Sequence, residues 1–440
     1  MAIPVGRNST VSRPPRHRLG YGKRQSREAK VTVGRRDLAR GAAALGLAAM
    51  AGGSFARGAR AEKKYGPGAS DTEIKVGQTM PYSGPASPYS TQGKAQLAFF
   101  AALNQKGGIN GRKVNLISLD DGYSPPKTVE QTRRLVEQEG VLFTFNQLGT
   151  PTNAAVQKYL NTKGVPQLFV STGASRWGDP EHFPWTMGWA PSYRAEGIVY
   201  GQYIMRHTPN AKIAVLYQND DFGKDFLNGF HDGLGEAGRK LIAREVTYEP
   251  SDPTIDSQIV TLKESGADTF FNIATAKFAA QAIRKLKAIE WQPVHFLNST
   301  AASIASTLVP AGVENSVGIV TSLYLKDIND PDFANADDVK WYLDFMKTQI
   351  PDGNPNDAGF AYGFATASTL VQVLKQCGDD LSRENVMRQA ASLHDLVVPM
   401  LLPGIKINTS PTRFFPVNQN QMAKFDGKSW VRFGEINSAS

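Results

Sequence analysis

The stretch "VLFTFNQLGTPTNAAVQKYLNTKGVPQLFVSTGAS", from Val141 to Ser175, contains two apolar strand-like segments separated by a short amphipathic one. The first strand-like segment is followed by "GTPTN", and the second, "QLFV", is followed by "STGAS". A strand–helix–strand order is typical of two parallel strands joined by a crossover helix. The stretch therefore predicts an α/β fold built on a parallel sheet.

The same alternation extends in both directions from this stretch, and it restarts after a segment rich in Trp and Pro, residues 183–193. The pattern predicts strands at 73–81, 113–121, 212–220, 240–248, 268–274 and 294–298, and helices at 90–108, 127–140, 152–164, 225–238, 255–266, 276–290 and 361–378. Regular β-α alternation predicts parallel sheets with helices on both faces. Two such units in tandem predict a two-lobed protein.

The charge is unevenly distributed along the chain. The whole sequence of 440 residues has a net charge of +9, but residues 1–61 contain 13 Lys and Arg against two acidic residues. These residues carry +11, which leaves −2 for the remainder. A basic charge confined to a leader gives no reason to expect a nucleic-acid partner. The single cysteine, Cys377, allows no intrachain disulfide.

The leader has the layout of an export signal. Arg35-Arg36 precedes the apolar run 41–53, and "ARA" at 59–61 fits a small-x-small cleavage site. We expect residues 1–61 to be a twin-arginine-like signal, removed after Ala61, although the Sec route and a start codon downstream of Met1 stay open. A basic tail with an Ala-rich helix is the alternative. The apolar run is too short to span a bilayer, so we expect a periplasmic protein.

The two loops that follow the opening strands combine hydroxyl groups, glycine amides and helix N-termini. The carboxyl ends of parallel strands meet at one edge of a sheet, which is where ligands bind. Hydroxyl groups and the positive end of a helix dipole favour a carboxylate. The sequence therefore predicts a carboxylate half-site here. The simpler alternative is that Thr152 and Ser175 only cap helices.

Catalytic and metal-binding signatures give little support to an enzyme. The chain contains no G-x-S-x-G, H-E-x-x-H or G-x-x-x-x-G-K-[ST] sequence. "GLGEAG" at 233–238 closes a predicted helix, whereas a dinucleotide fingerprint opens one. The six histidines are scattered, and Asp120-Asp121 is best interpreted as a strand-end pair. We expect no catalysis, no metal and no cofactor.

Several motifs resemble the periplasmic solute-binding proteins of ABC importers, of the leucine/isoleucine/valine-binding type. They are "SGPASPYSTQG", "NQKGGINGRKV", "LGTPTNAAV", "KGVPQLFVSTGAS", "AVLYQNDDFGKD" and "FDGKSWV", spread over residues 72–435. The resemblance implies two α/β lobes joined by three chain crossings, which close on a small ligand at the hinge. It places lobe 1 at 72–190 plus 323–403 and lobe 2 at 191–322 plus 404–440. It also implies a monomer that delivers its ligand to membrane permease subunits. A sensor domain of the same fold is the rival interpretation.

The resemblance also implies which residues contact the ligand: Tyr89, Thr150, Gly173, Ser175, Phe222, Thr275 and Thr300. The sequence departs from the family at Thr300, where amino-acid binders have an acid for the ligand ammonium. No Asp or Glu lies between Glu290 and Glu314. A buried ammonium without a countercharge costs several kcal/mol. We therefore expect an aromatic or aliphatic organic acid. The alternative is an amino acid or amide whose ammonium is held by Asp220, Asp221 or Glu196.

Overall fold

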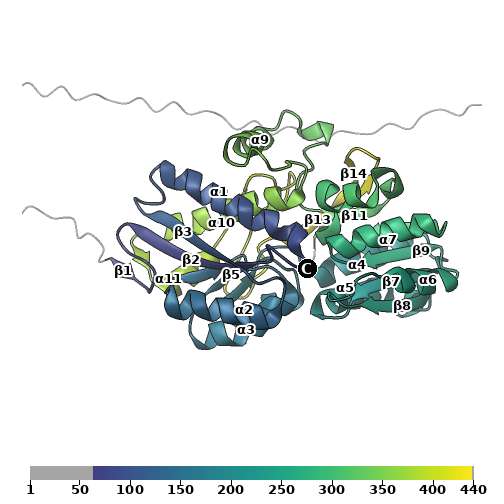
Figure 1. Ribbon diagram of the computed structural model, residues 1–440, viewed down its shortest axis with the longest axis horizontal. Coiled ribbons are helices and arrows are strands. Elements are labelled where there is room, and N and C mark those ends of the chain that lie inside the picture. The colour runs from purple at the N-terminus through teal and green to yellow at the C-terminus, as the bar shows by residue number, and fades with distance from the viewer. Residues whose placement is uncertain (1–62, 439–440) are drawn as a thin grey trace, which may run out of the picture. The chain divides into compact units, whose positions relative to one another are not determined.

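Two sheets form the framework of the protein in a computed structural model that describes residues 63–438 (Figure 1). The predicted signal, residues 1–61, lies outside these residues. The first sheet has the order β3-β2-β4-β5-β6, and all its neighbouring strands are parallel. Its strands are β2 (Glu73–Met80), β3 (Lys113–Asp120), β4 (Phe143–Phe145), β5 (Gln167–Val170) and β6 (Thr186–Gly188).

Helices cover both faces of the first sheet. Helices α1 and α10 lie on one face, and α2 and α3 lie on the other (Figure 1). Helix α9 packs on α10, where Trp341 and Phe345 contact the ring of Phe364 at centroid distances of 4.8 and 4.9 Å. The helices are α1 (Ser90–Gln105), α2 (Pro125–Arg133), α3 (Thr150–Thr162), α9 (Asp337–Gln349), α10 (Ala358–Cys377) and α11 (Arg383–Ala390).

The second sheet has the order β14-β13-β11-β10-β9-β7-β8. Strand β13 runs antiparallel to both of its neighbours, β14 and β11, and the other pairs are parallel. The strands are β7 (Ile213–Gln218), β8 (Ile242–Tyr248), β9 (Thr269–Ile273), β10 (Val294–Leu297), β11 (Val320–Leu323), β13 (Gln419–Phe425) and β14 (Trp430–Ser438). The helices are α4 (Tyr193–His207), α5 (Asp221–Arg239), α6 (Asp256–Glu264), α7 (Ala276–Ala288) and α8 (Val309–Ala311). The predicted two-lobed α/β architecture is confirmed.

Helices α4 and α5 approach each other closely on one face of the second sheet. A Cβ atom at Gly197 would lie 2.3 Å from the carbonyl oxygen of Phe226, and one at Gly229 would lie 1.9 Å from that of Arg194. Only glycine fits such backbone contacts. The low helix propensity of glycine is therefore offset by packing, and the sequence pattern alone does not predict α4.

The chain passes between the two sheets three times, and the passages lie together. Trp189 precedes the first passage, Tyr324 follows the second and Val417 precedes the third. Val417 N donates to Trp189 O at 3.2 Å, and the rings of Trp189 and Tyr324 are 6.2 Å apart. The exact division into lobes stays a proposal. Because Ile405 and Phe414 pack in the core of the first sheet, the packing favours a boundary near residue 418 over residue 403.

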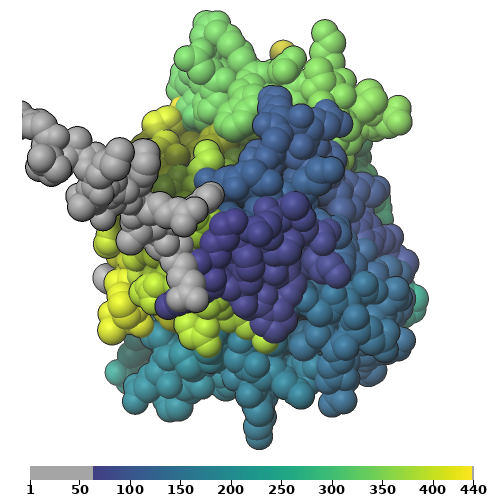
Figure 2. Space-filling view, turned by 90° about the vertical axis from the view of Figure 1, so that its left-hand side faces the viewer, coloured from purple at the N-terminus to yellow at the C-terminus, as the bar shows by residue number. Residues whose placement is uncertain are grey.

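The first described residues join the C-terminal part of the chain. Strand β1 (Lys64–Tyr65) pairs in parallel with β12 (Asp380–Leu381). Figure 2 shows the start of the described chain, in purple, on the surface beside yellow-green residues from the C-terminal part. This short pairing is therefore a seam between distant segments.

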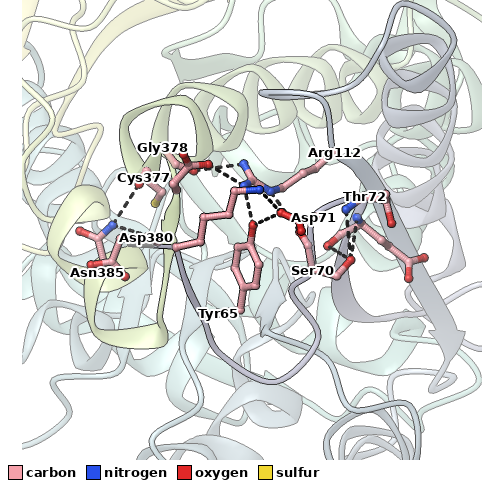
Figure 3. Close-up of polar contacts among 12 residues, drawn as sticks. Tyr65, Ser70, Asp71, Thr72, Arg112, Cys377, Gly378, Asp380 and Asn385 are labelled. Carbon is pink, nitrogen blue, oxygen red and sulfur yellow. Dashed lines mark hydrogen bonds and ion pairs between the residues drawn. The ribbon is translucent and has the colours of Figure 1, made fainter. Parts of the chain in front are cut away.

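Arg112 holds the seam together (Figure 3). Its side chain is buried, with 3% of its surface exposed. It donates to four oxygens: Ser70 O at 3.0 Å, Gly378 O at 3.3 Å, Tyr65 Oη at 2.8 Å and Asp379 Oδ1 at 2.6 Å. A hydrogen bond from a charged donor contributes about 1.5–3 kcal/mol. One guanidinium thus links both partners of the seam to the body of the first lobe.

We predict that Arg112→Met lowers the free energy of unfolding by about 3 kcal/mol, because it removes the charged donor and leaves buried acceptors unpaired. The matched control is Arg134→Met, which breaks an exposed pair with Glu139 at 3.4 Å and should cost less than about 1 kcal/mol. Urea unfolding of both variants measures the difference. Equal losses would contradict the role given to Arg112.

Candidate functional site

A cavity of about 160 Å³ lies between the carboxyl ends of the strands of the two sheets. Residues of both sheets and of the segments that join them line it. A cavity of about 150 Å³ holds a benzene molecule, so this space suits a small solute. Five of the seven predicted contact residues line it together: Tyr89, Thr150, Phe222, Thr275 and Thr300.

Two threonine hydroxyls belong to the polar part of the wall from the first sheet. Thr150 begins α3 and Thr172 follows β5, and their Oγ1 atoms are 2.5 Å apart. Thr172 Oγ1 also accepts from Trp177 Nε1 at 3.2 Å. Both threonines are 2% exposed. The phenol of Tyr193 is also hydrogen-bonded to Thr172, so three hydroxyl groups share two hydrogen bonds and one proton of this network remains for an acceptor in the cavity.

Gly173 and Ser175 do not line the cavity. A Cβ atom at Gly173 would lie 2.2 Å from Pro191 O, so close packing leaves room only for glycine at this position. Ser175 donates to the carboxylate of Asp225 on α5, from its backbone N at 2.9 Å and from its Oγ at 2.8 and 3.0 Å. The anion bound by "STGAS" is therefore a side chain of the protein itself. Arg176 makes a second link to α5 through Asp221, at 2.9 Å.

The opposite wall is joined to the first lobe by Tyr89. Its phenol oxygen accepts from Ala276 N, at the start of α7, at 2.9 Å. Burial raises the pKa of Tyr89 to about 12, and hydrogen bonds from Ala276 and Thr300 oppose the rise. The phenol stays neutral at physiological pH and links the two lobes across the cavity. Thr300 also donates its backbone N–H to Asn298 Oδ1 at 3.1 Å.

Aromatic side chains form much of the remaining lining: Tyr89, Tyr123, Tyr193, Phe222, Tyr324, Tyr362 and Trp430. Tyr193 meets Phe222 edge to face at 5.2 Å, and Trp189 behind the wall meets Tyr362 at 5.1 Å. Such contacts fix ring orientations. The cavity therefore presents rigid aromatic surface to its contents.

The charged residues of the lining are Lys326, Asp327 and Asp357. Lys326 Nζ is paired with Asp338 Oδ2 at 2.5 Å. Asp357 caps α10 and is 8% exposed. The sequence motifs do not predict a site role for this aspartate, although "NPND" before an amphipathic segment is a helix N-cap signal.

The three acids considered as ammonium partners do not line the cavity. Asp220 caps α5, Asp221 pairs with Arg176, and Glu196 is buried. Glu196 accepts from Ser299 N at 2.8 Å, from Ser299 Oγ at 2.6 Å and from Tyr200 Oη at 2.9 Å. Burial raises the pKa of Glu196, and these hydrogen bonds oppose the rise. Its structural role is to brace the strand-end loop behind the cavity.

Within residues 63–438, no cluster of three or more His, Cys, Asp or Glu side chains is arranged to hold a metal ion. No helix in the same range is both long enough and apolar enough to cross a membrane.

The sequence matches the family of periplasmic binding proteins over residues 73–426, and the protein belongs to this family. It is 28% identical over 327 residues to Leu/Ile/Val-binding protein homolog 1 of Brucella abortus, which covers 72% of this chain and 82% of that protein. The resemblance to leucine/isoleucine/valine-binding proteins is confirmed. The family consists of binding proteins and not of enzymes.

Two solved structures have the same fold. One is a branched-chain amino acid ABC transporter protein from Thermus thermophilus with bound valine, with a TM-score of 0.74 and 14% identity over 84% of this chain and 98% of that chain. The other is a solute-binding protein from Rhodopseudomonas palustris in complex with 3,4-dihydroxybenzoic acid, with a TM-score of 0.69 and 17% identity over 83% and 98%.

We predict that Asp225→Ala lowers the free energy of unfolding by about 2 kcal/mol, because Ser175 loses the acceptor of its backbone and hydroxyl hydrogen bonds. The neighbouring Asp221→Ala removes an exposed ion pair and should cost less than about 1 kcal/mol. Urea unfolding measures both losses, and hydrogen exchange of the Ser175 amide should accelerate only in the first variant. An unchanged exchange rate there would contradict the link.

Proposed function

We propose that the protein is the extracytoplasmic solute-binding component of an ABC importer and captures a small ligand with a carboxylate group. The observation that carries the proposal is the Thr150–Thr172 hydroxyl pair at the start of α3. A helix N-terminus and buried hydroxyl donors favour an anion. The protein would be exported, act as a monomer and deliver the ligand to membrane permease subunits.

The residues that line the cavity indicate the chemical character of the part of the ligand beyond its carboxylate. Tyr89 and Phe222 come from different lobes and both face the cavity, which supports an aromatic or branched aliphatic body. An organic acid is the candidate that the sequence favours, because no Asp or Glu lies between Glu290 and Glu314. A ligand that also carries a positive group is the second candidate, and the presence of Asp327 and Asp357 in the lining favours it.

We predict that Thr150→Val weakens carboxylate binding by about tenfold to a hundredfold, because it keeps the side-chain volume and removes a hydroxyl that binds a charged group. The matched control is Thr152→Val on the same helix. Thr152 Oγ1 donates to Leu148 O and Gly149 O and does not line the cavity. Loss of the Thr152 hydroxyl should change the affinity for the carboxylate by less than about threefold.

Calorimetry with 3-phenylpropanoate, 4-methylpentanoate, phenylalanine and leucine measures these affinities. Phenylalanine differs from 3-phenylpropanoate, and leucine from 4-methylpentanoate, only by the α-ammonium group. Comparing the affinities within each pair therefore shows whether an organic acid or a ligand with a positive group binds more tightly. If Thr150→Val binds as tightly as the unchanged protein, the hydroxyl pair is only part of a helix terminus. If no carboxylate in the panel binds, the proposed function is wrong.

A further inference from the structure

The charges that line the cavity are unbalanced. Among the described lining residues the one cation, Lys326, is neutralised by Asp338, while Asp327 and Asp357 form no ion pair within 4.0 Å. Lys94, which does not line the cavity, acts on Asp357 electrostatically but forms no ion pair with it. A ligand that carries only a carboxylate would bring a third negative charge into this space. Like charges at short range in a poorly solvated site repel strongly. A ligand with a positive group beside its carboxylate avoids this cost.

Asp357 is the better placed of the two acids to meet that group. Asp327 has both oxygens engaged, since Oδ1 accepts from Asn329 and Oδ2 from Trp430 N. For Asp357, the hydrogen bonds from Gly359 N at 2.9 Å and Ser303 Oγ at 3.3 Å both reach Oδ1, and the Thr91 side chain is a further hydrogen-bond partner of this carboxylate. Asp357 thus supplies negative charge in the lining while acting as a helix cap.

The type of positive group follows from the aromatic lining. Seven aromatic residues line the cavity, five of them tyrosines. Aromatic faces attract cations, and cages of such faces recognise quaternary ammonium groups. A primary ammonium needs an acceptor for each of its three protons. A methylated ammonium needs none, which suits a carboxylate whose Oδ1 already accepts two hydrogen bonds.

We propose that the ligand is a betaine-like zwitterion, whose methylated ammonium group lies against the aromatic lining beside Asp357 and whose carboxylate meets Thr150 and Thr172. This inference rests on the proposed function and adds a second charge to the ligand. It assigns Asp357 a role in specificity.

The test compares isosteres that differ only in the charged centre. Glycine betaine is matched with 3,3-dimethylbutanoate, and 4-(trimethylammonio)butanoate with 5,5-dimethylhexanoate; in each pair a carbon atom replaces the ammonium nitrogen. We expect at least one betaine to bind at least about tenfold more tightly than its isostere. Binding of the isosteres, or of leucine, at least as tightly as both betaines would overturn the inference and leave the proposed function intact. Absence of binding by every carboxylate would overturn both.

A second experiment measures the affinities of the variant Asp357→Asn for the same compounds. Asparagine caps a helix as well as aspartate does, so the fold is kept while the charge is removed. Betaine affinity should fall by about tenfold, and affinity for the uncharged isostere should stay the same or rise. The matched control is Asp330→Asn, a helix cap paired with Arg432 that does not line the cavity. Equal effects of the two variants, or equal effects on both compounds, would overturn the role of Asp357.

Discussion

The carboxyl ends of parallel strands from both sheets face one cavity, and this constraint decides which residues can touch a ligand. β4 leads to Thr150 and β5 to Thr172, while β9 leads to Thr275 and β10 to Thr300. Side chains from four strand ends therefore meet although the sequence separates them. Parallel sheets place their loops in this way whatever their sequence, which explains why one fold serves binding proteins for different solutes.

Contacts inside the protein then limit which strand-end groups remain for a ligand. "STGAS" has the composition of an anion site, and it does bind a carboxylate, that of Asp225. The sequence shows the donors but not the acceptor, because Asp225 lies 50 residues further along the chain on a helix of the other lobe. "GTPTN" has similar composition, yet its Thr150 stays in the cavity lining. Composition alone therefore cannot separate a ligand site from an internal link.

Most of the fold could be predicted from hydrophobic periodicity, since β5 lies where expected at 167–170 and α1 begins at Ser90. The elements that the pattern does not predict include α4, α9, α11 and β11. Of these, α4 contains Gly197 and Gly201, which lower local helix propensity and are explained only by the approach of α5. Asp357 was missed for a different reason. A helix cap is recognisable locally, but its position in the cavity depends on how α10 packs beside α1.

The central claim is that the two lobes close around one small ligand, with Tyr89 and Ala276 in contact across the cavity. Small-angle scattering of the mature chain, without ligand and saturated with the tightest-binding compound of the panels above, tests it most directly. The account predicts a smaller radius of gyration in the saturated sample, because a ligand that touches both lobes favours the closed form. An identical radius of gyration in the two samples would contradict it.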